Sequence, residues 1–195
     1  MAQDTAYFEH VTRGLQRAAE SSRVESDPER ALNQITRVAQ QVLGDPEAGK
    51  RAGVGDFRCS GVFLVAPSRD HLILFAENGY PPEQHRARIS VMDSNPGLVV
   101  RTGEPKIVPD TDNDPNFRQI LSTVRVGSSC YLPVIWQRQV LGMFNVAAEA
   151  RYALSDIDLR MGLLFANLSA ATWIALGGPC FLEKVVASLP PWSAN

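Results

Sequence analysis

Cysteine is the residue type in this chain best suited to covalent chemistry, because a thiolate is a strong nucleophile. The chain has three cysteines, at Cys59, Cys130 and Cys180. Cys130 is the most plausible nucleophile, but it lies in the apolar run SSCYLPVI, and burial among apolar side chains raises the pKa of a thiol and makes it inert. We therefore interpret Cys130 as a core residue, with a reactive thiol as the less favoured alternative.

The other candidates for catalysis or metal binding do not combine into a site. No histidine has a Cys or His partner at zinc-ligand spacing, and the two serines before Cys130 lack the turn of a nucleophile elbow. These residues are His10, His71, His85, Ser128 and Ser129. The sequence predicts a protein that is not an enzyme and holds no metal ion.

Two segments carry part of a phosphate-binding or calcium-binding pattern. GDPEAGKR (44–51) has the Gly and Lys spacing of a Walker A loop, but Arg51 replaces the Ser or Thr that holds magnesium, and a helix precedes it where a strand is required. DTDNDP (110–115) begins like a calcium loop, but Pro115 stands where the sharp turn needs Gly. We interpret both segments as loops, the second with Asp114 capping the turn that starts at Pro115.

A pocket wall is the functional feature that the remaining residues indicate. The segments expected to form it are a helix from Pro96 to Thr102, the loop DTDNDPNF and the strand SSCYLPVI. Small-molecule sites are commonly apolar clefts with a few placed polar groups, and the residues expected to supply them are Asp110, Asn113, Phe117, Ser129, Tyr131 and Asn145. Alternation puts Ser129 and Tyr131 on one face of the strand and Cys130 and Leu132 on the other, without indicating which face meets the pocket.

Helices and strands in mixed order must position these residues. Helical spacing of apolar residues predicts three helices. The first covers 4–22, the second runs from a capping box at Ser26 and Glu29 to Gly44, and the third covers 155–176. The segment 45–56 is expected to be a mobile loop. Apolar runs predict strands, at 60–67, 71–77, 86–91, 105–109, 128–135 and 139–148. Hairpin connections between them favour an α+β fold, with a mostly antiparallel sheet and helices gathered on its faces.

The last predicted helix is apolar on nearly every side and needs cover on more than one face. We expect the sheet to cover one side and a helix of a second subunit the other, so that the protein is a homodimer. A membrane span over 161–178 is disfavoured, because Asn167 interrupts the run and the charged Asp158 and Arg160 bound it closely. The tail, 178–195, is too apolar to be free and is expected to dock on the body.

Composition narrows the classes of partner and the compartment. The 195 residues are 45% hydrophobic and 21% charged, ordinary values for one globular domain, and the net charge of -2 provides no basic surface for nucleic acid or anionic lipid. Three scattered cysteines do not make a disulfide framework, and the N-terminus lacks the pattern of a signal peptide. We expect a cytoplasmic protein with no nucleic-acid or membrane partner.

Three segments in order resemble the core of a GAF domain. They are PGLVVRTGEPKIVPDTDNDPNF, SSCYLPVIWQRQVLGMFNV and YALSDIDLRMGLLFANLSAATWIA. The resemblance implies a profilin/PAS-like fold, a central antiparallel sheet of about six strands flanked by helices, with the first and last helices on one side and a ligand cavity on the other. It also implies three parts: an N-terminal helix over 1–25 available for dimerisation, a GAF-like domain over 26–177 and a C-terminal tail over 178–195.

Functional variants of this family carry different residues. For cyclic nucleotide binding, Asn145, Tyr152 and Asp156 align with the family's signature, but Val146 and Ile157 fall where Lys and Glu belong. Free methionine sulfoxide reductases use cysteines in this fold, and alignment puts the residues Val99 and Ser122 at those positions. Neither variant is therefore favoured, and no cofactor is indicated.

The resemblance thus favours a non-catalytic module that senses a small molecule of unknown identity and signals through its terminal helices to a separate output protein. Its ligand-binding residues would be Asp110, Phe117, Ser129, Tyr131 and Asn145. The alternative is a degenerate GAF domain whose cavity is filled by its own side chains and which serves for dimerisation or protein docking. A thiol-based redox enzyme using Cys130 ranks third.

Overall fold

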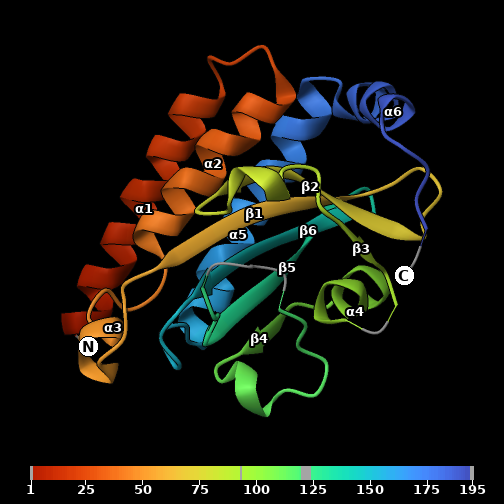
Figure 1. Cartoon of the computed structure of the whole chain (residues 1–195). Coiled ribbons are helices and arrows are strands. Elements are labelled where there is room, and N and C mark those ends of the chain that lie inside the picture. Colours follow the sequence, from red (N-terminus) through yellow and green to blue (C-terminus); the bar gives the residue numbers. More distant parts are fainter. Residues whose placement is uncertain (1, 93, 120–123, 194–195) are drawn as a thin grey trace.

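Six strands form one antiparallel sheet in the computed structural model, which describes residues 2–92, 94–119 and 124–193 (Figure 1). The strand order is β3-β2-β1-β6-β5-β4, and every neighbouring pair is antiparallel, which confirms the predicted α+β fold. The strands are β1 (Arg58–Val65), β2 (His71–Asn78), β3 (Arg88–Ser90), β4 (Lys106–Val108), β5 (Ser128–Trp136) and β6 (Gln139–Ala148). The outermost strands, β3 and β4, are only three residues long.

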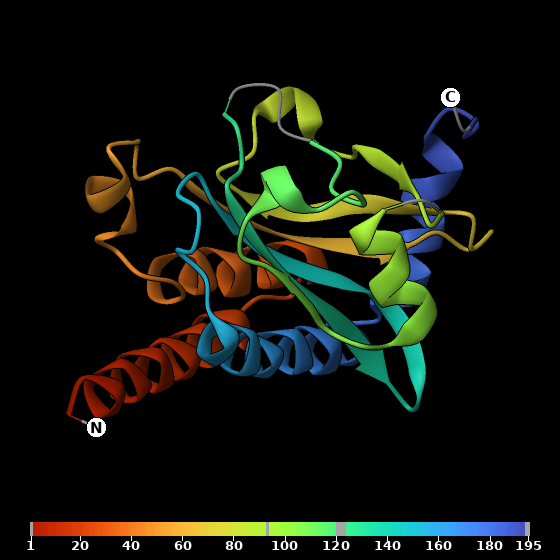
Figure 2. The same ribbon diagram turned by 90° about the horizontal axis from the view of Figure 1, so that it is seen from below.

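Long helices cover one face of the sheet, and short elements cover the other. Figure 2 shows α1, α2 and α5 together below the sheet, with α4 and two 3₁₀ helices on the opposite side. The helices are α1 (Ala2–Ser22), α2 (Pro28–Val42), α3 (Ala48–Ala52), α4 (Asn95–Thr102), α5 (Asp156–Ala175) and α6 (Gly178–Ser188), and the 3₁₀ helices are η1 (Pro82–Gln84) and η2 (Thr111–Asn113). The expected placement of the first and last helices on one side is therefore found.

Strand alternation divides the core in two. Cys130, Leu132 and Phe144 lie in the larger apolar cluster under α2 and α5, whereas Tyr131 and Met143 lie in a smaller cluster under α4. Because neighbouring residues of a strand point to opposite faces, β5 and β6 each serve both clusters. The two clusters therefore contact the same two strands from opposite sides.

The helix starts differ in part from the predicted ones. Asp27, not Ser26, caps α2, and its carboxylate accepts a hydrogen bond from Arg30 N at 2.8 Å. The predicted capping box at Ser26 is therefore wrong; Pro28, directly after Asp27, takes the first helical position, where its missing N–H costs little. At α5, the Ser155 capping box forms with Asp158, as the spacing of these residues predicts.

Two segments predicted without regular structure contain helices. The loop expected at 45–56 includes α3, which ends at Gly53 in a left-handed conformation with φ of 68°. The tail expected at 178–195 forms α6 and then turns back onto the sheet, where the Trp192 ring stacks on His71 with centroids 4.9 Å apart. Arg88 Nη1 of β3 also donates to Pro190 O at 2.6 Å, so the tail is joined to an outer strand.

A helix that spans a membrane needs about 20 largely apolar residues. Among the described residues, no single helix is long and apolar enough to cross one, and α5 and α6 pass that test only as a pair bent by 82°.

Candidate functional site

Two rows of residues run across the sheet on the face that α4 covers. Pairing across β5, β6 and β1 places Ser129 opposite Ala147, which stands opposite Cys59. The next row places Tyr131 opposite Asn145, which stands opposite Gly61. Residues directly opposite each other in an antiparallel sheet share a face, so the polar side chains of both rows point to the same side. This decides the question that alternation leaves open: the Ser129 and Tyr131 face meets the cavity.

A cavity of about 30 Å³ lies above these rows. It is lined by Cys59, Tyr80, Phe117, Arg118, Val126, Ser129, Tyr131, Asn145 and Ala147. Four of the five predicted ligand-binding residues are thus brought together at one place. A cavity needs roughly 10–15 Å³ to hold one water molecule, so this one takes at most about two or three waters in the conformation described.

The polar centre of the cavity is the contact between Tyr80 and Asn145. The Tyr80 hydroxyl lies 3.1 Å from Asn145 Oδ1 and 2.9 Å from Nδ2. Asn145 is only 5% exposed, so this contact satisfies an amide that water does not reach. A Cβ at Gly61 would lie 3.2 Å from Asn145 Oδ1 and 2.9 Å from a Leu74 methyl group, so glycine leaves the room that the amide occupies.

The thiol and the two tyrosine hydroxyl groups in the cavity wall are protonated and neutral at physiological pH. Burial raises the pKa of the Cys59 thiol to about 12, and burial also raises the pKa of the Tyr131 hydroxyl to about 12. The pKa of Tyr80 is also raised well above its usual value, chiefly because its hydroxyl group is desolvated. The wall therefore offers hydrogen bonds without a full charge; Arg118, an exposed residue, is the charged member of the lining.

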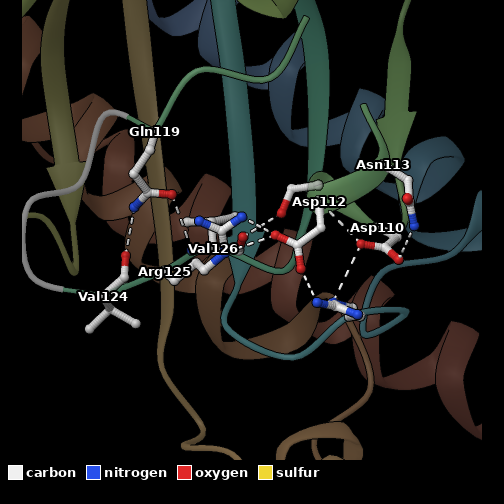
Figure 3. Close-up of polar contacts among 9 residues, drawn as sticks. Asp110, Asp112, Asn113, Gln119, Val124, Arg125 and Val126 are labelled. Carbon is white, nitrogen blue, oxygen red and sulfur yellow. Dashed lines mark hydrogen bonds and ion pairs between the residues drawn. The ribbon is translucent and has the colours of Figure 1, made fainter. Parts of the chain in front are cut away.

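Asp110, the fifth predicted residue, does not line this cavity. Its carboxylate accepts hydrogen bonds from Asp112 N at 3.1 Å and from Asn113 Nδ2 at 2.8 Å, as Figure 3 shows, and pairs with Arg151. Asp112 in turn accepts from Arg125 Nε at 2.8 Å. Asp110 and Asn113 therefore hold the η2 loop in shape, and the prediction that they join the other polar groups is corrected.

Cys59 and Tyr80 are wall residues that the sequence analysis missed. Cys59 alternates with Gly61 and Phe63 along β1, but only the register with β6 and β5 reveals that it lies on the same face of the sheet as Ser129. Tyr80 follows β2 in the turn GYPP, where no periodic pattern exists to assign it a face. Both depend on contacts between segments far apart in the chain.

The three thiols differ sharply in surroundings. Cys130 is buried on the helix-covered face, and burial, with the negative charges of Asp158 and Asp156, raises its pKa well above the usual range. Cys180 is exposed on α6. Of the positions aligned with reductase cysteines, Val99 is buried in α4 and Ser122 lies outside the described residues. Within the described part of the chain, no three His, Cys, Asp or Glu side chains lie together suitably for a metal ion.

The difference in exposure among the three cysteines predicts that a thiol reagent labels them selectively. At neutral pH a disulfide reagent such as dithionitrobenzoate should modify Cys180 rapidly in the native protein, and all three thiols only in denaturant. The physical reason is that Cys59 and Cys130 are both inaccessible and protonated. Rapid native labelling that persists in Cys180→Ser would contradict this reading.

The chain matches a family model described as "GAF domain" over residues 25–176. The GAF domain of a Coxiella burnetii phosphoenolpyruvate-protein phosphotransferase superposes with a TM-score of 0.75 at 16% identity, covering 89% of this chain and 98% of that one. That of the Acinetobacter phosphoenolpyruvate-protein phosphotransferase gives 0.67 at 14% identity, covering 92% and 96%.

An enzyme of the same fold is also similar. Free methionine-R-sulfoxide reductase from Neisseria meningitidis superposes with a TM-score of 0.69 at 18% identity, covering 89% of this chain and 91% of that one. No curated protein matches the chain. Since the family model covers residues 25–176, which is most of the sequence, the chain belongs to the GAF domain family.

Proposed function

We propose that this GAF domain binds a small molecule in the cavity above β1, β5 and β6 and acts by conformational change rather than by catalysis. The observation that carries the proposal is the uncharged polar wall: Tyr80, Asn145, Ser129 and Tyr131 meet on a sheet face whose packing alone would favour apolar side chains. Such a wall, apolar with a few placed polar groups, is what small-molecule sites commonly have.

The strands supply the route from the cavity to the terminal helices. Leu132 follows the wall residue Tyr131 in β5 and points to the other face, where a Cβ at Gly162 of α5 would lie only 2.6 Å from its Cδ1. The backbone of α5 thus rests directly on the strand that carries Tyr131. A ligand can change the position of α5 relative to β5 only to the extent that it binds the protein more tightly in one position of the helix than in another.

Native mass spectrometry of protein purified gently from its own host is the test. A retained small molecule, lost from Asn145→Ala but kept by Asn167→Ala, is the expected result. Asn167 is a matched control because it is an exposed asparagine on α5. If every variant carries no ligand under conditions that preserve other complexes, the result would favour the alternative. In that alternative the domain serves for dimerisation or protein docking and its own side chains fill the cavity. The small volume of the cavity, about 30 Å³, is the observation that favours this alternative.

A reductase is the second candidate function, because Cys59 lines the cavity and free methionine-R-sulfoxide reductases share the fold. The raised pKa of Cys59 and the two non-cysteine residues at aligned positions oppose it. Incubation with free methionine-R-sulfoxide and dithiothreitol should give no methionine above the protein-free control. Turnover that disappears in Cys59→Ser would replace the sensing proposal with a catalytic one.

We propose in addition that the protein is a cytoplasmic homodimer that pairs through α5. Ile157, Met161, Leu164, Leu168 and Ala171 recur at alternating spacings of four and three, the pattern of a helix-pairing seam. Leu164 is 41% exposed at the middle of this stripe. Leu164→Glu should therefore halve the mass in light scattering, whereas Val24→Glu, at a 78% exposed apolar position between α1 and α2, should not. A separate output protein would bind these helices and respond to a change in their arrangement.

A further inference from the structure

The cavity must enlarge before it can hold a ligand, because about 30 Å³ is room for only a few water molecules. Much of its wall stands on the paired strands β1, β5 and β6, namely Cys59, Ser129, Tyr131 and Asn145. Tyr80 differs, because it stands on the connection between β2 and β3. A movement of this connection would enlarge the cavity without breaking the sheet.

Segment 79–87, which carries Tyr80, passes from the cavity face to the helix-covered face of the sheet. Figure 2 shows η1, in the middle of this segment, on the side away from α2. The Tyr80 ring meets Phe63 of the smaller cluster edge to face, with centroids 6.3 Å apart. Near the other end, Arg86 Cζ lies 4.0 Å from the centroid of the Phe75 ring, which belongs to the cluster under α2 and α5. The segment thus connects the two faces.

Arg86 fastens this segment to the helices. Its Nη2 donates to Glu29 Oε2 in the first turn of α2 at 2.5 Å, and its Nη1 donates to Phe75 O at 3.0 Å. Both side chains of the ion pair are largely buried, so salt screens the pair only weakly. Arg86 also has a left-handed backbone, with φ of 65°, which costs free energy in a residue with a Cβ. The side-chain contacts must outweigh this cost, and losing them favours release of the segment.

His85, the residue before Arg86, adds contacts at the same place. Its Nδ1 lies 2.7 Å from Glu77 Oε1, and its Nε2 lies 3.7 Å from Glu29 Oε1. The Glu29 carboxylate therefore contacts two consecutive residues of the segment.

The start of the segment covers Cys59. Cys59 is completely buried, and the Tyr80 hydroxyl group lies within hydrogen-bonding reach of its thiol. A Cβ at Gly79 would lie 3.0 Å from Cys59 Cα, so the segment also rests on the β1 backbone. Lifting the segment would expose Cys59, whereas Cys130, buried on the other face, would stay covered.

We propose that segment 79–87 is a lid on the cavity and that the ion pair of Arg86 with Glu29 is its latch. A ligand larger than a few water molecules enters when the lid lifts, and lifting the lid separates Arg86 from the start of α2. Entry of the ligand and a change at α2 are then one event. The inference rests on the proposed sensing function and names the device that regulates access to its site.

The labelling rate of Cys59 measures opening of the lid. In Cys180→Ser, which lacks the exposed thiol, the native full-length protein is incubated with iodoacetamide at one fixed pH, and modified cysteines are identified by peptide mass spectrometry. Adding Arg86→Gln should raise the labelling rate of Cys59 at least about tenfold, the scale of one lost hydrogen bond between charged groups. The labelling rate of Cys130 should rise by a much smaller factor, because it reports opening of the helix-covered face.

Two further variants complete the test. Glu29→Gln keeps the shape of the side chain and removes its charge, so the labelling rate of Cys59 should rise by a smaller factor, at least about threefold. Arg37→Gln is the matched control, because Arg37 is an exposed arginine of α2 whose side chain bonds to Gln34. It should leave the labelling rate of Cys59 unchanged.

Two results would overturn the inference. One is acceleration of Cys59 and Cys130 by the same factor, which would mean loss of global stability; the other is an unchanged rate at Cys59 in a folded Arg86→Gln protein. If Arg86→Gln does not fold, Glu29→Gln decides by the same two criteria.

Native mass spectrometry separates failure of the lid from failure of the sensing function. A small molecule retained by a protein whose Cys59 stays closed in Arg86→Gln would overturn the lid and leave sensing intact. Selective opening at Cys59 in a protein that retains nothing from its host would support the lid and count against sensing.

Discussion

Replacing Asp158 with alanine should lower the free energy of unfolding by about 3–5 kcal/mol, the scale of several buried donors left unsatisfied and a large part of the total for a domain of this size. Asp158 is 5% exposed, and its carboxylate accepts hydrogen bonds from Tyr7 of α1, from Gly44 N at 2.6 Å and from Ser155 N at 2.8 Å. Removing it leaves several buried donors without an acceptor, which costs more than the bonds themselves contribute. The side chain joins α1, the end of α2 and the start of α5.

Urea unfolding followed by circular dichroism measures this loss. Asp156→Ala is the matched control, because Asp156 lies in the same first helical turn but is exposed, so only its favourable interaction with the helix dipole, about 0.3–1 kcal/mol, is lost. Equal losses in the two variants would show that the buried network contributes nothing beyond that dipole interaction.

Trp173→Ala should be the second most damaging change, at about 3–5 kcal/mol. Trp173 of α5 is 2% exposed and meets the Phe75 ring of β2 edge to face, with centroids 5.2 Å apart. A Cβ at Gly178, the first residue of α6, would lie 2.1 Å from the Trp173 ring, so α6 is seated directly on the indole. Truncation leaves a cavity at the point where the sheet, α5 and α6 meet.

Equilibrium unfolding and amide hydrogen exchange together test this prediction. The exchange rates of the α6 amides should rise more than those of α2, because α6 loses the surface on which it packs. Trp136→Ala serves as the control, since Trp136 is 37% exposed at the end of β5 and should cost less than about 1 kcal/mol. Unchanged protection of α6 in Trp173→Ala would mean that other contacts hold this helix.

The strands and long helices were predictable because their signals are local. Apolar runs and helical spacing depend on residues within one segment, and so does the pairing of Ser155 with Asp158. Asp27 shows the limit: two neighbouring residues can both cap a helix, and the sequence does not say which backbone geometry wins.

The site was predictable only in part because it is assembled across strands. Alternation alone places Ser129 and Tyr131 together, but their meeting with Cys59 requires the register of three strands, and Asn95 reaches Lys106 only once α4 is packed on the sheet. Asp110 is an example of the opposite error, a residue predicted for the site that does not line it. Its carboxylate accepts hydrogen bonds from Asp112 and Asn113 within its own loop.

The shortness of β3 and β4 has a consequence for behaviour at high concentration. An outer strand offers unpaired N–H and C=O groups along its length, and a long one invites pairing with another chain and growth into aggregates. Here both ends of the sheet offer only three residues, and on one of them Arg88 is joined to Pro190 of the returning tail. The sheet is thus a poor template for pairing with another chain. The tail that stacks on His71 also covers part of one outer edge of the sheet.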